Sequence, residues 1–483
     1  MSQIPSPPRS RPEQKIPSKS GNIPTIPVQI PHESATAHVS GEAKFVDDLP
    51  PYQGEIRVDY IPSPSAHGKI RGHNFEELKQ IPGILGVFTH QDLPGKNVFG
   101  NIISDEPFLP EDEVHYVGQP VAVIAAESPE AARLARKQSR LEIEEREPVF
   151  TIEQALAQEE FLGVSRKIER GDFSKAWKDA ENRLEGTFHC NGQEHFYLES
   201  QAVLAWPGEE GQLHIHSSTQ NTSEIQQVVA EALDLGFHQV VSDCKRMGGG
   251  FGGKETQAAI PAVMAALVAH KLKRPARVVF SKDDDMKTTG KRHPFLIEYK
   301  AAFTDQGRVT GLEVQLFSNG GAYADLSTAI MERAMLHSDN AYFIPNILIQ
   351  GQVCRTNLPP NTALRGFGGP QGMANIENIL QEISITLRKD AFEVRRLNCY
   401  GHQNQNVTPY GQVVHAHCLP EMMDRLAEKT SYHERLSQIE AFNRQSKTHL
   451  RGIALTPMKF GISFTTSFLN QGNALVNIYL DGT

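Results

Sequence analysis

A glycine-rich stretch at residues 245–255 constrains this chain more than any other feature. It reads KRMGGGFGGKE, and glycine fills five of the six positions from Gly248 to Gly253. A run with so few side chains cannot fill a hydrophobic core, and glycine adopts backbone angles that other residues avoid. The stretch therefore predicts either a turn of special geometry or a close approach of a ligand to the backbone.

Length and composition place this stretch in a globular protein of several domains. The chain has 483 residues, of which 39% are hydrophobic, and this length predicts roughly two to four domains. The net charge is −9, with no basic block of the kind that binds phosphates. No apolar run reaches the ~20 residues of a membrane helix, and prolines interrupt the N-terminus where a signal peptide would be apolar. We therefore expect a cytoplasmic protein that binds neither nucleic acid nor membrane.

The cysteines predict free thiols. They are odd in number and widely separated, without the grouped spacing of metal or iron–sulfur sites. A disulfide framework and a cluster held by this chain alone are therefore not expected. The five are Cys190, Cys244, Cys354, Cys399 and Cys418.

The first third of the chain predicts a tail followed by a small α/β domain. Residues 1–28 are rich in Pro and Ser and are expected either to be disordered or to lie extended on a partner. Within a domain at 29–150, an apolar β-branched run at 121–124 precedes a helix start at 128–130, with a capping Ser, Pro and Glu. A second strand is expected at 141–143.

A linker at 151–174 is expected to lead into a larger domain at 175–420. In this domain a strand is expected at residues 240–242, directly before the glycine stretch. The other expected elements are strands at 186–190 and 213–216, a helix through 231–233 that Thr222 or Ser223 caps and Gly236 ends, and a helix at about 257–272.

A second glycine cluster, RGFGGP at 365–370, precedes a helical pattern at 374–388. Two phenylalanine-containing glycine loops at helix entrances predict two halves of one binding site.

The last sixty residues predict helices and then a strand. Helical patterns cover 421–429 and 433–443. Residues 474–480 alternate like a strand and lead into Asp481-Gly482, a common hairpin turn, yet no return strand follows. This pattern predicts a polypeptide that is cut short.

The glycine stretch almost matches the phosphate-binding loop of nucleotide hydrolases. In that motif Ser or Thr follows the lysine and holds magnesium, but here Glu255 follows Lys254, and a carboxylate repels phosphate. Two interpretations remain from the residues alone: a structural turn, or successive backbone N–H groups that bind an anionic or oxo-bearing ligand. Phe251 either offers its ring to a flat substrate or packs in the core.

Several motifs resemble the molybdenum-binding large subunit of the xanthine dehydrogenase family, in its bacterial two-subunit form. Besides the glycine stretch these are GQEHFYLES at 192–200, STQN at 218–221, IMERAM at 330–335, NTALRGFGGPQGM at 361–373 and TPMKFGISFT at 456–465. The resemblance implies an α+β fold, with an α/β hammerhead domain at 29–150 and a first molybdopterin-binding domain at 175–420. Connecting helices and the beginning of a second such domain would then occupy 421–483.

The resemblance implies that the glycine stretch contacts the molybdenum cofactor. Gln220 would lie beside an oxo ligand of the metal. Phe251, with its neighbours Gly250 and Gly252, and Arg365 would touch the cofactor. Gln220, Phe251 and Arg365 would be the residues nearest the molybdenum centre.

The resemblance also implies a purine site. Phe367 and Phe464 would hold the flat ring between them, with Thr465 beside it. Glu255 and Arg333 would grip the polar edge of the purine, a pair that within the family marks purine oxidisers. Both would be catalytic residues. For Arg333 the reason is that a fixed guanidinium stabilises negative charge that develops on the ring. The implied reaction is hydroxylation of xanthine or hypoxanthine to urate.

The family continues well beyond Thr483 and carries its general-base glutamate there, so the chain is expected to be incomplete and inactive alone. Electrons would pass to a small partner subunit with iron–sulfur clusters and FAD, and then to NAD, within a hetero-oligomer. The alternative is a non-catalytic remnant that binds only a partner or a purine.

Overall fold

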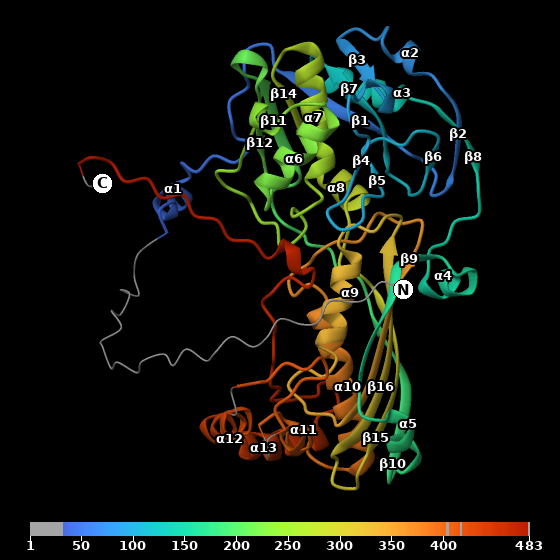
Figure 1. Cartoon of the computed structure of the whole chain (residues 1–483), viewed down its shortest axis with the longest axis vertical. Coiled ribbons are helices and arrows are strands. Elements are labelled where there is room, and N and C mark those ends of the chain that lie inside the picture. The colour runs from blue at the N-terminus through green and yellow to red at the C-terminus, as the bar shows by residue number, and fades with distance from the viewer. Residues whose placement is uncertain (1–31, 402–404, 416–417, 482–483) are drawn as a thin grey trace, which may run out of the picture. The chain divides into compact units, whose positions relative to one another are not determined.

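The computed structural model describes residues 32–401, 405–415 and 418–481 (Figure 1). The chain divides into two compact units, Met1–Lys44 and Phe45–Thr483. In the described part of the first unit the only helix is α1 (Ala35–Ser40), which ends at Gly41 in a left-handed conformation. The predicted disordered tail at 1–28 lies outside the described residues.

A seven-stranded sheet occupies the upper half of the larger unit in Figure 1. Its strand order is β13-β12-β11-β14-β1-β7-β3, and β1 pairs in parallel with β14. The strands are β1 (Ile56–Pro62), β3 (Ile84–Phe88), β7 (Pro120–Ala126), β11 (Ala202–Pro207), β12 (Leu213–Ser217), β13 (Val240–Asp243) and β14 (Ala276–Val279). The sheet therefore joins strands from the expected hammerhead segment to strands from the expected larger domain.

Helix α7 (Ala259–Leu272) packs on this sheet and is apolar on all sides, as expected for a helix inside a core. It contacts α6 (Thr222–Ala232), whose N-cap is Asn221. The prediction that Thr222 or Ser223 caps this helix is wrong, because the Asn221 side chain accepts the hydrogen bond from the backbone N–H of Glu224 at 3.2 Å. The amide oxygen of the short Asn side chain accepts this N-cap hydrogen bond as well as the hydroxyl oxygen of Ser or Thr does.

The predicted strand–helix–strand unit near residue 130 is confirmed. Helix α3 (Pro129–Gln138) begins where Ser128 accepts a hydrogen bond from Ala131. It packs on β7, whose seven residues are all buried because its side chains enter two hydrophobic clusters, one on each face of the sheet. The following strand, β8, belongs to a separate three-stranded sheet of order β6-β2-β8. The remaining elements here are β2 (Gly68–His73), α2 (Phe75–Leu78), β4 (Val98–Phe99), β5 (Glu106–Pro107), β6 (Glu113–Val114) and β8 (Leu141–Glu145).

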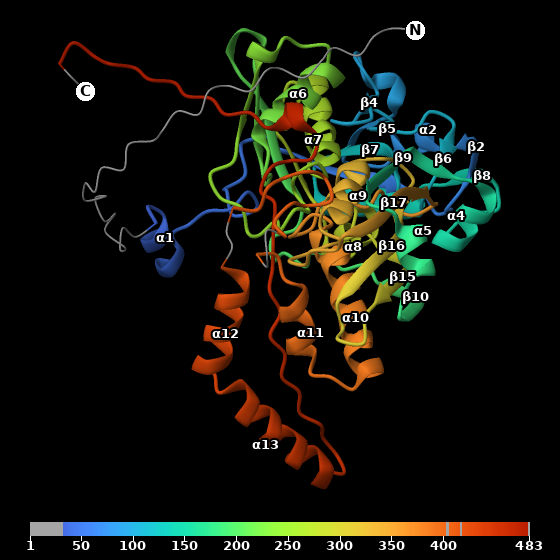
Figure 2. The ribbon, with the colours of Figure 1, turned by 60° about the horizontal axis from the view of Figure 1, so that its bottom comes forward.

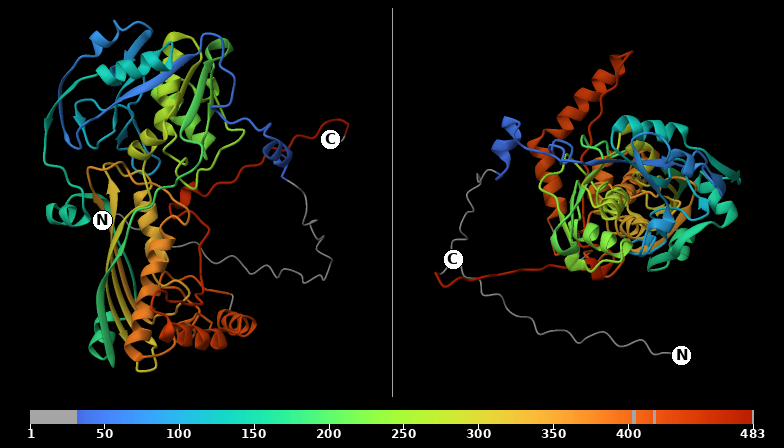
Figure 3. Two further views of the ribbon diagram at one scale, coloured as in Figure 1. Left: turned by 180° about the vertical axis from the view of Figure 1, so that it is seen from behind. Right: turned by 90° about the horizontal axis from the view of Figure 1, so that it is seen from above.

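A five-stranded sheet of order β10-β15-β16-β17-β9 lies below the first sheet in Figure 1. Helices α9 (Ser327–Leu336) and α10 (Gly369–Leu387) run beside its long strands, which Figure 3 also shows from behind. The strands are β9 (Phe161–Arg170), β10 (Asn182–Cys190), β15 (Phe295–Phe303), β16 (Val309–Gly321) and β17 (Asn346–Arg355).

Residues 151–174 are part of this sheet rather than a linker. They form α4 (Ile152–Gln158), β9 and the start of α5 (Phe173–Lys178), and β9 pairs with β17. Most side chains of β9 are exposed, so the strand is held by backbone hydrogen bonds at the sheet edge. Its sequence consequently lacks the alternation of a half-buried strand.

Helix α10 begins five residues before its predicted start. Pro370 stands in its first turn, where the missing N–H of proline has no helical partner to lose. The second glycine cluster therefore forms the entrance of the helix itself.

The predicted helices near the C-terminus are confirmed as α12 (Leu419–Lys429) and α13 (Tyr432–Gln445). They lie on the side of α11 (Ala391–Asn398) away from α10 (Figure 2). The predicted strand at 474–480 is not formed, because no described strand pairs with it and a strand requires a hydrogen-bonded neighbour. Gly482, the second residue of the predicted turn, lies outside the described residues.

All five cysteines are free, as predicted, although only Cys354 and Cys399 are fully buried. A further short helix is α8 (Lys282–Thr288), and single turns of 3-10 helix occur at 90–92, 209–211, 237–239 and 467–469. Among the helices that the structure describes, none has the length and apolar character needed to cross a membrane.

Candidate active site

The two glycine loops are in contact. The backbone N–H of Arg365 donates a hydrogen bond to the carbonyl oxygen of Phe251 at 2.9 Å. The first loop follows β13 of the seven-stranded sheet, and the second lies between β17 of the five-stranded sheet and α10. The candidate site therefore forms where the two sheets meet.

Glycine is required at the contact between these loops. Gly252 has a φ of +104°, and a Cβ atom there would lie 2.5 Å from the carbonyl oxygen of Ala363. In the second loop a Cβ at Gly368 would lie 2.1 Å from the carbonyl oxygen of Ile330 on α9. Both positions combine a backbone angle that side chains disfavour with a close approach of another backbone.

We expect Gly252→Ala to destabilise the protein and to reduce its cofactor content. Backbone strain alone costs about 1–3 kcal/mol, and the clash with Ala363 adds to it. Gly452→Ala is the matched control, since Gly452 is exposed and a Cβ atom added there would have no heavy atom within 4 Å. Denaturant unfolding and molybdenum analysis of both variants provide the measurement, and equal stability of the two would contradict the close-approach argument.

Gln220 supports the first loop from the STQN motif. Its side-chain oxygen accepts hydrogen bonds from the backbone N–H groups of Gly252 at 2.8 Å and Lys254 at 3.3 Å. Its own backbone N–H donates to the Lys254 carbonyl at 2.8 Å. With the oxygen engaged, the amide nitrogen Nε2 remains as a donor for a ligand.

Lys254 has a structural role that the sequence did not reveal. Its side chain is fully buried, and Nζ lies 2.7 Å from the carbonyl oxygen of Glu199 and 2.7 Å from Oγ of Ser218. Oε2 of Glu199 accepts a hydrogen bond from the N–H of Gly248 at 2.7 Å and lies 3.4 Å from Nζ. Glu199 therefore contacts both Gly248, at the start of the first loop, and Lys254, at its end. The available signal was Glu199 in the GQEHFYLES motif, a carboxylate that could partner the lysine.

An open cavity of about 600 Å³ collects four of the predicted substrate residues. The rings of Phe367 and Phe464 pack against each other in a tilted arrangement, with centroids 5.1 Å apart and an interplanar angle of 58°. The cavity is lined by Glu255, Arg333, Gly366, Phe367, Phe460, Ile462, Phe464, Leu469, Asn470 and Gln471. Residues more than two hundred positions apart in the chain thus share one wall.

The Arg333 side chain is almost completely buried beside this cavity. Its two terminal nitrogens donate to the carbonyl oxygens of Gly461 and Ser463. The guanidinium also lies over the rings of Phe367, at 5.7 Å, and Phe460, at 5.4 Å. Arg333 therefore holds the C-terminal segment against α9, and its Nε has no hydrogen-bond partner among the described residues. Burial lowers the pKa of the Arg333 guanidinium, but the arginine stays charged.

Glu255, which lines the cavity, is coupled electrostatically to two other carboxyl groups that do not line it, Asp325 and Glu224. Burial, with repulsion from Asp325 as a smaller cause, raises the pKa of Glu255 to about 7. Burial likewise raises the pKa of Asp325 to about 6 and that of Glu224 to about 8, with Glu255 among the charges that act on Glu224. At neutral pH Glu255 is therefore present in both its protonated and its ionised form.

Stability is expected to fall as pH rises from about 4.5 to about 7, the window between the pKa of Glu255 in the unfolded chain and in the folded protein. The folded protein keeps a proton up to about pH 7 that the unfolded chain releases near the ordinary value of 4.5, so ionisation favours unfolding. Glu255→Gln should consequently gain melting temperature relative to the wild type on going from about pH 5 to about pH 8. The exposed Glu428→Gln serves as control. A wild-type-minus-variant difference that does not change with pH would contradict the raised pKa.

The other predicted site residues do not line the cavity. Gly250, Phe251 and Gly252 lie in the first loop, where Phe251 is half exposed, and Arg365 is exposed beside them. Thr465 donates its hydroxyl to the carbonyl oxygen of Ala329 at 3.2 Å.

Two further residues shape the cavity and escaped the sequence prediction. Phe460 packs on His337, and His337 accepts a hydrogen bond from the N–H of Gly461 at 3.1 Å. Asn470 bonds to both backbone groups of Phe464, each at 2.8 Å. The contacts of Phe460 and Gly461 with His337 join the C-terminal segment to the end of α9, and sequence patterns alone do not reveal them.

The first loop suits an anionic, oxo-bearing group such as the molybdenum cofactor. The backbone N–H groups of Gly249, Gly250 and Phe251 donate no hydrogen bond within the described chain. These three consecutive N–H groups and the side-chain Nε2 of Gln220 are donors that suit a negatively charged ligand. A Cβ at Gly250 would lie 2.5 Å from the Gln220 oxygen, so a side chain there would displace this support.

Family models match most of the chain. The hammerhead domain of aldehyde oxidase and xanthine dehydrogenase matches residues 40–147, and the molybdopterin cofactor-binding domain matches residues 156–399. A second molybdopterin cofactor-binding domain matches residues 425–483. The predicted α+β fold class and the predicted molybdopterin cofactor are thereby confirmed.

Xanthine dehydrogenases are similar along nearly the whole chain. Xanthine dehydrogenase/oxidase of Mus musculus is 42% identical over 97% of this chain, and xanthine dehydrogenase of Dictyostelium discoideum is 40% identical over 94%. The chain covers 35% and 33% of these proteins, about a third of their length.

Solved structures show the same fold. The aldehyde oxidoreductase from Desulfovibrio gigas superposes with a TM-score of 0.79 at 26% identity, over 86% of this chain and 47% of that one. The aldehyde oxidoreductase from Desulfovibrio desulfuricans gives a TM-score of 0.79 at 25% identity, over 86% of this chain and 48% of that one. With its hammerhead and molybdopterin-binding domains, the chain belongs to the aldehyde oxidase and xanthine dehydrogenase family.

Proposed function

We propose that this chain provides the substrate cavity of a purine hydroxylase that converts xanthine or hypoxanthine toward urate. The observation that carries the proposal is the cavity in which Glu255 and Arg333 accompany the rings of Phe367 and Phe464. Aromatic faces suit a flat heterocycle, and a cation with a carboxyl group suits its alternating carbonyl and N–H edge. The similarity to xanthine dehydrogenases over almost the whole chain supports the same substrate class.

Each residue of the cavity has a separate task in this reaction. Phe367 and Phe464 orient the purine plane. Glu255, with a pKa of about 7, donates or accepts a hydrogen bond according to the tautomer that the ring presents. Arg333 faces the edge on which negative charge develops, and a preorganised cation in a buried site lowers the energy of that charge.

Gln220 and the unpaired N–H groups of Gly249, Gly250 and Phe251 would hold the molybdenum cofactor. When bound, the cofactor supplies the two-electron oxidation that replaces a ring C–H bond with a C–O bond, the oxygen coming from water. Overall, the C–H bond and one water molecule give the hydroxylated product, two electrons and two protons, one proton deriving from the C–H bond and one from the water. We assign the further path of the electrons to iron–sulfur clusters and FAD outside this chain, on a partner subunit that passes them to NAD.

Steady-state assays of the assembled holoenzyme test the proposal. Xanthine, hypoxanthine and an aromatic aldehyde should be compared as electron donors for reduction of a dye, with urate measured as product. We expect purine turnover to exceed aldehyde turnover and to scale with molybdenum content. Preferential oxidation of the aldehyde would contradict the purine assignment and would indicate an aldehyde-oxidising member of the family. Purine binding without any turnover in a molybdenum-loaded protein would instead favour the non-catalytic alternative.

A further inference from the structure

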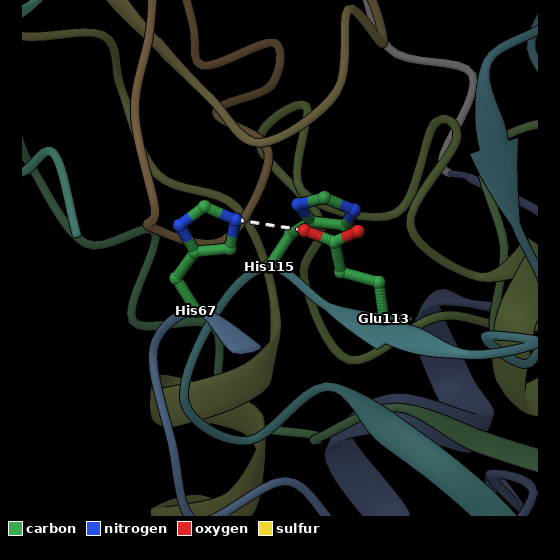
Figure 4. Close-up of side chains that lie close together, drawn as sticks. All are labelled: His67, Glu113 and His115. Atoms are coloured by element: carbon green, nitrogen blue, oxygen red, sulfur yellow. Dashed lines mark hydrogen bonds and ion pairs between the residues drawn. The ribbon is translucent and has the colours of Figure 1, made fainter. Parts of the chain in front are cut away.

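Two histidines and a glutamate come together in the three-stranded sheet (Figure 4). Gly68 of β2 pairs with Val114 of β6 in antiparallel register, so His67 and His115 lie opposite each other across the strands. Glu113 is two residues from His115, and side chains at this spacing along a strand point to the same face. The register of two strands thus places all three side chains together.

The three side chains are in close contact. Nε2 of His67 lies 2.9 Å from Oε1 of Glu113, and the imidazole rings are stacked with centroids 5.6 Å apart. One potential ligand atom from each residue lies within 4.8 Å of the others. All three side chains are half-buried, which is a more protected setting than a cluster of surface carboxylates has.

The surrounding chain supports these side chains. Nδ1 of His67 lies 3.4 Å from the carbonyl oxygen of Glu147, so this nitrogen can carry the ring proton and leave Nε2 as an acceptor. Arg146 donates to Oε1 of Glu113 at 2.8 Å and leaves Oε2 available. Partners of this kind orient ligands in metal sites.

The backbone of His115 is fixed by two hydrogen bonds to side chains. Its backbone N–H donates to Oε1 of Gln119 at 2.7 Å, and its carbonyl accepts from Nδ2 of Asn357 at 3.0 Å.

We propose that His67, Glu113 and His115 bind a divalent transition-metal ion of the zinc class. Two imidazoles and one carboxylate match the ligand preference of such ions, and three protein ligands leave one position for water. Tetrahedral zinc brings its ligand atoms to about 3.3 Å from one another, so the two imidazoles close around the ion by side-chain rotation. The ion would fasten β2 to β6.

This site is separate from the candidate active site. None of its three residues lines the cavity of Arg333 and Phe367, and none belongs to either glycine loop. Binding of the ion is therefore expected to stabilise the hammerhead sheet while leaving the chemistry of the cavity unchanged.

Zinc titration of the chelator-treated protein tests this proposal. Isothermal calorimetry with zinc chloride should show one tight site, and zinc should raise the melting temperature. Titration with cobalt(II) should give the visible absorption bands of a nitrogen- and oxygen-ligated ion. Loss of an outer-shell partner weakens a metal site roughly 10- to 100-fold, so we expect His67→Ala and His115→Ala to weaken zinc binding by more than this.

Two additional variants make the result decisive. Glu113→Gln keeps the shape of the side chain, removes the anionic ligand and should also abolish the zinc-dependent rise in melting temperature. His90→Ala, in the same domain but outside the cluster, should bind zinc like the wild type. Zinc binding that persists unchanged in all three cluster variants, or a wild-type protein that binds no zinc at this site, overturns the proposal.

Discussion

Arg333→Met is expected to lower xanthine turnover by about 100- to 1,000-fold while molybdenum content stays close to that of the wild type. The guanidinium is buried at the cavity wall, where a fixed cation stabilises charge that develops in the transition state. Methionine fills a similar volume without the charge. Turnover of xanthine and metal content per protein are the two measurements.

The same arginine also holds the carbonyl groups of Gly461 and Ser463, so a structural contribution has to be separated from a catalytic one. Arg333→Lys keeps the charge but not the planar fork of donors. Protease sensitivity of the segment after Leu450 reports whether that segment has detached. Arg435→Met, on the exposed surface of α13, is the matched control. Parallel losses of turnover and molybdenum in Arg333→Met would assign this residue to structure alone.

Lys254→Met is expected to have the largest effect on stability, a loss of about 3–5 kcal/mol with loss of the cofactor. The substitution leaves the carboxylate of Glu199 largely buried and without its cation. Glu199 also receives the N–H of Gly248, so its rearrangement disturbs the first loop where the cofactor is expected to bind. Chemical denaturation and molybdenum content measure the two consequences.

Removing both charges gives a sharper version of this test. The double variant Glu199→Gln with Lys254→Met should be less destabilised than the sum of the two single variants, because neither charge is then left unpaired. The exposed Lys429→Met should behave like the wild type. Additive losses in the double variant would show that the two side chains act independently.

The glycine loops show how far sequence reasoning reaches. Five glycines in six positions predicted unusual backbone geometry, and positive φ angles at Gly249 and Gly252 bear this out. Phe251 and Phe367 also take positive φ angles, of 55° and 51°, which no propensity argument predicts for phenylalanine. Phe251 also lies where the two loops meet, since its carbonyl oxygen accepts the N–H of Arg365, and that contact exists only in the folded protein.

The predictions for β9 and for residues 474–480 were wrong for opposite reasons. The first is a strand whose side chains are mostly exposed, so its pattern looked like a linker, and its partner β17 begins more than 170 residues away. The second has the alternation of a strand but no partner among the described residues. In both cases, whether a strand forms depends on a partner strand to hydrogen-bond with, and the sequence of one segment does not show whether that partner is there.

The sequence by itself determined the family, the α+β class and the residue types of the cavity, because motifs and glycine runs are local and keep their order along the chain. Only the tertiary structure decided what those residues do to one another. It placed Arg333 against the backbone of the C-terminal segment, buried Lys254 against Glu199, and brought His67 opposite His115. Burial and pairing set the charge state and hydrogen-bond partners of a side chain, and both arise from segments that lie far apart in sequence.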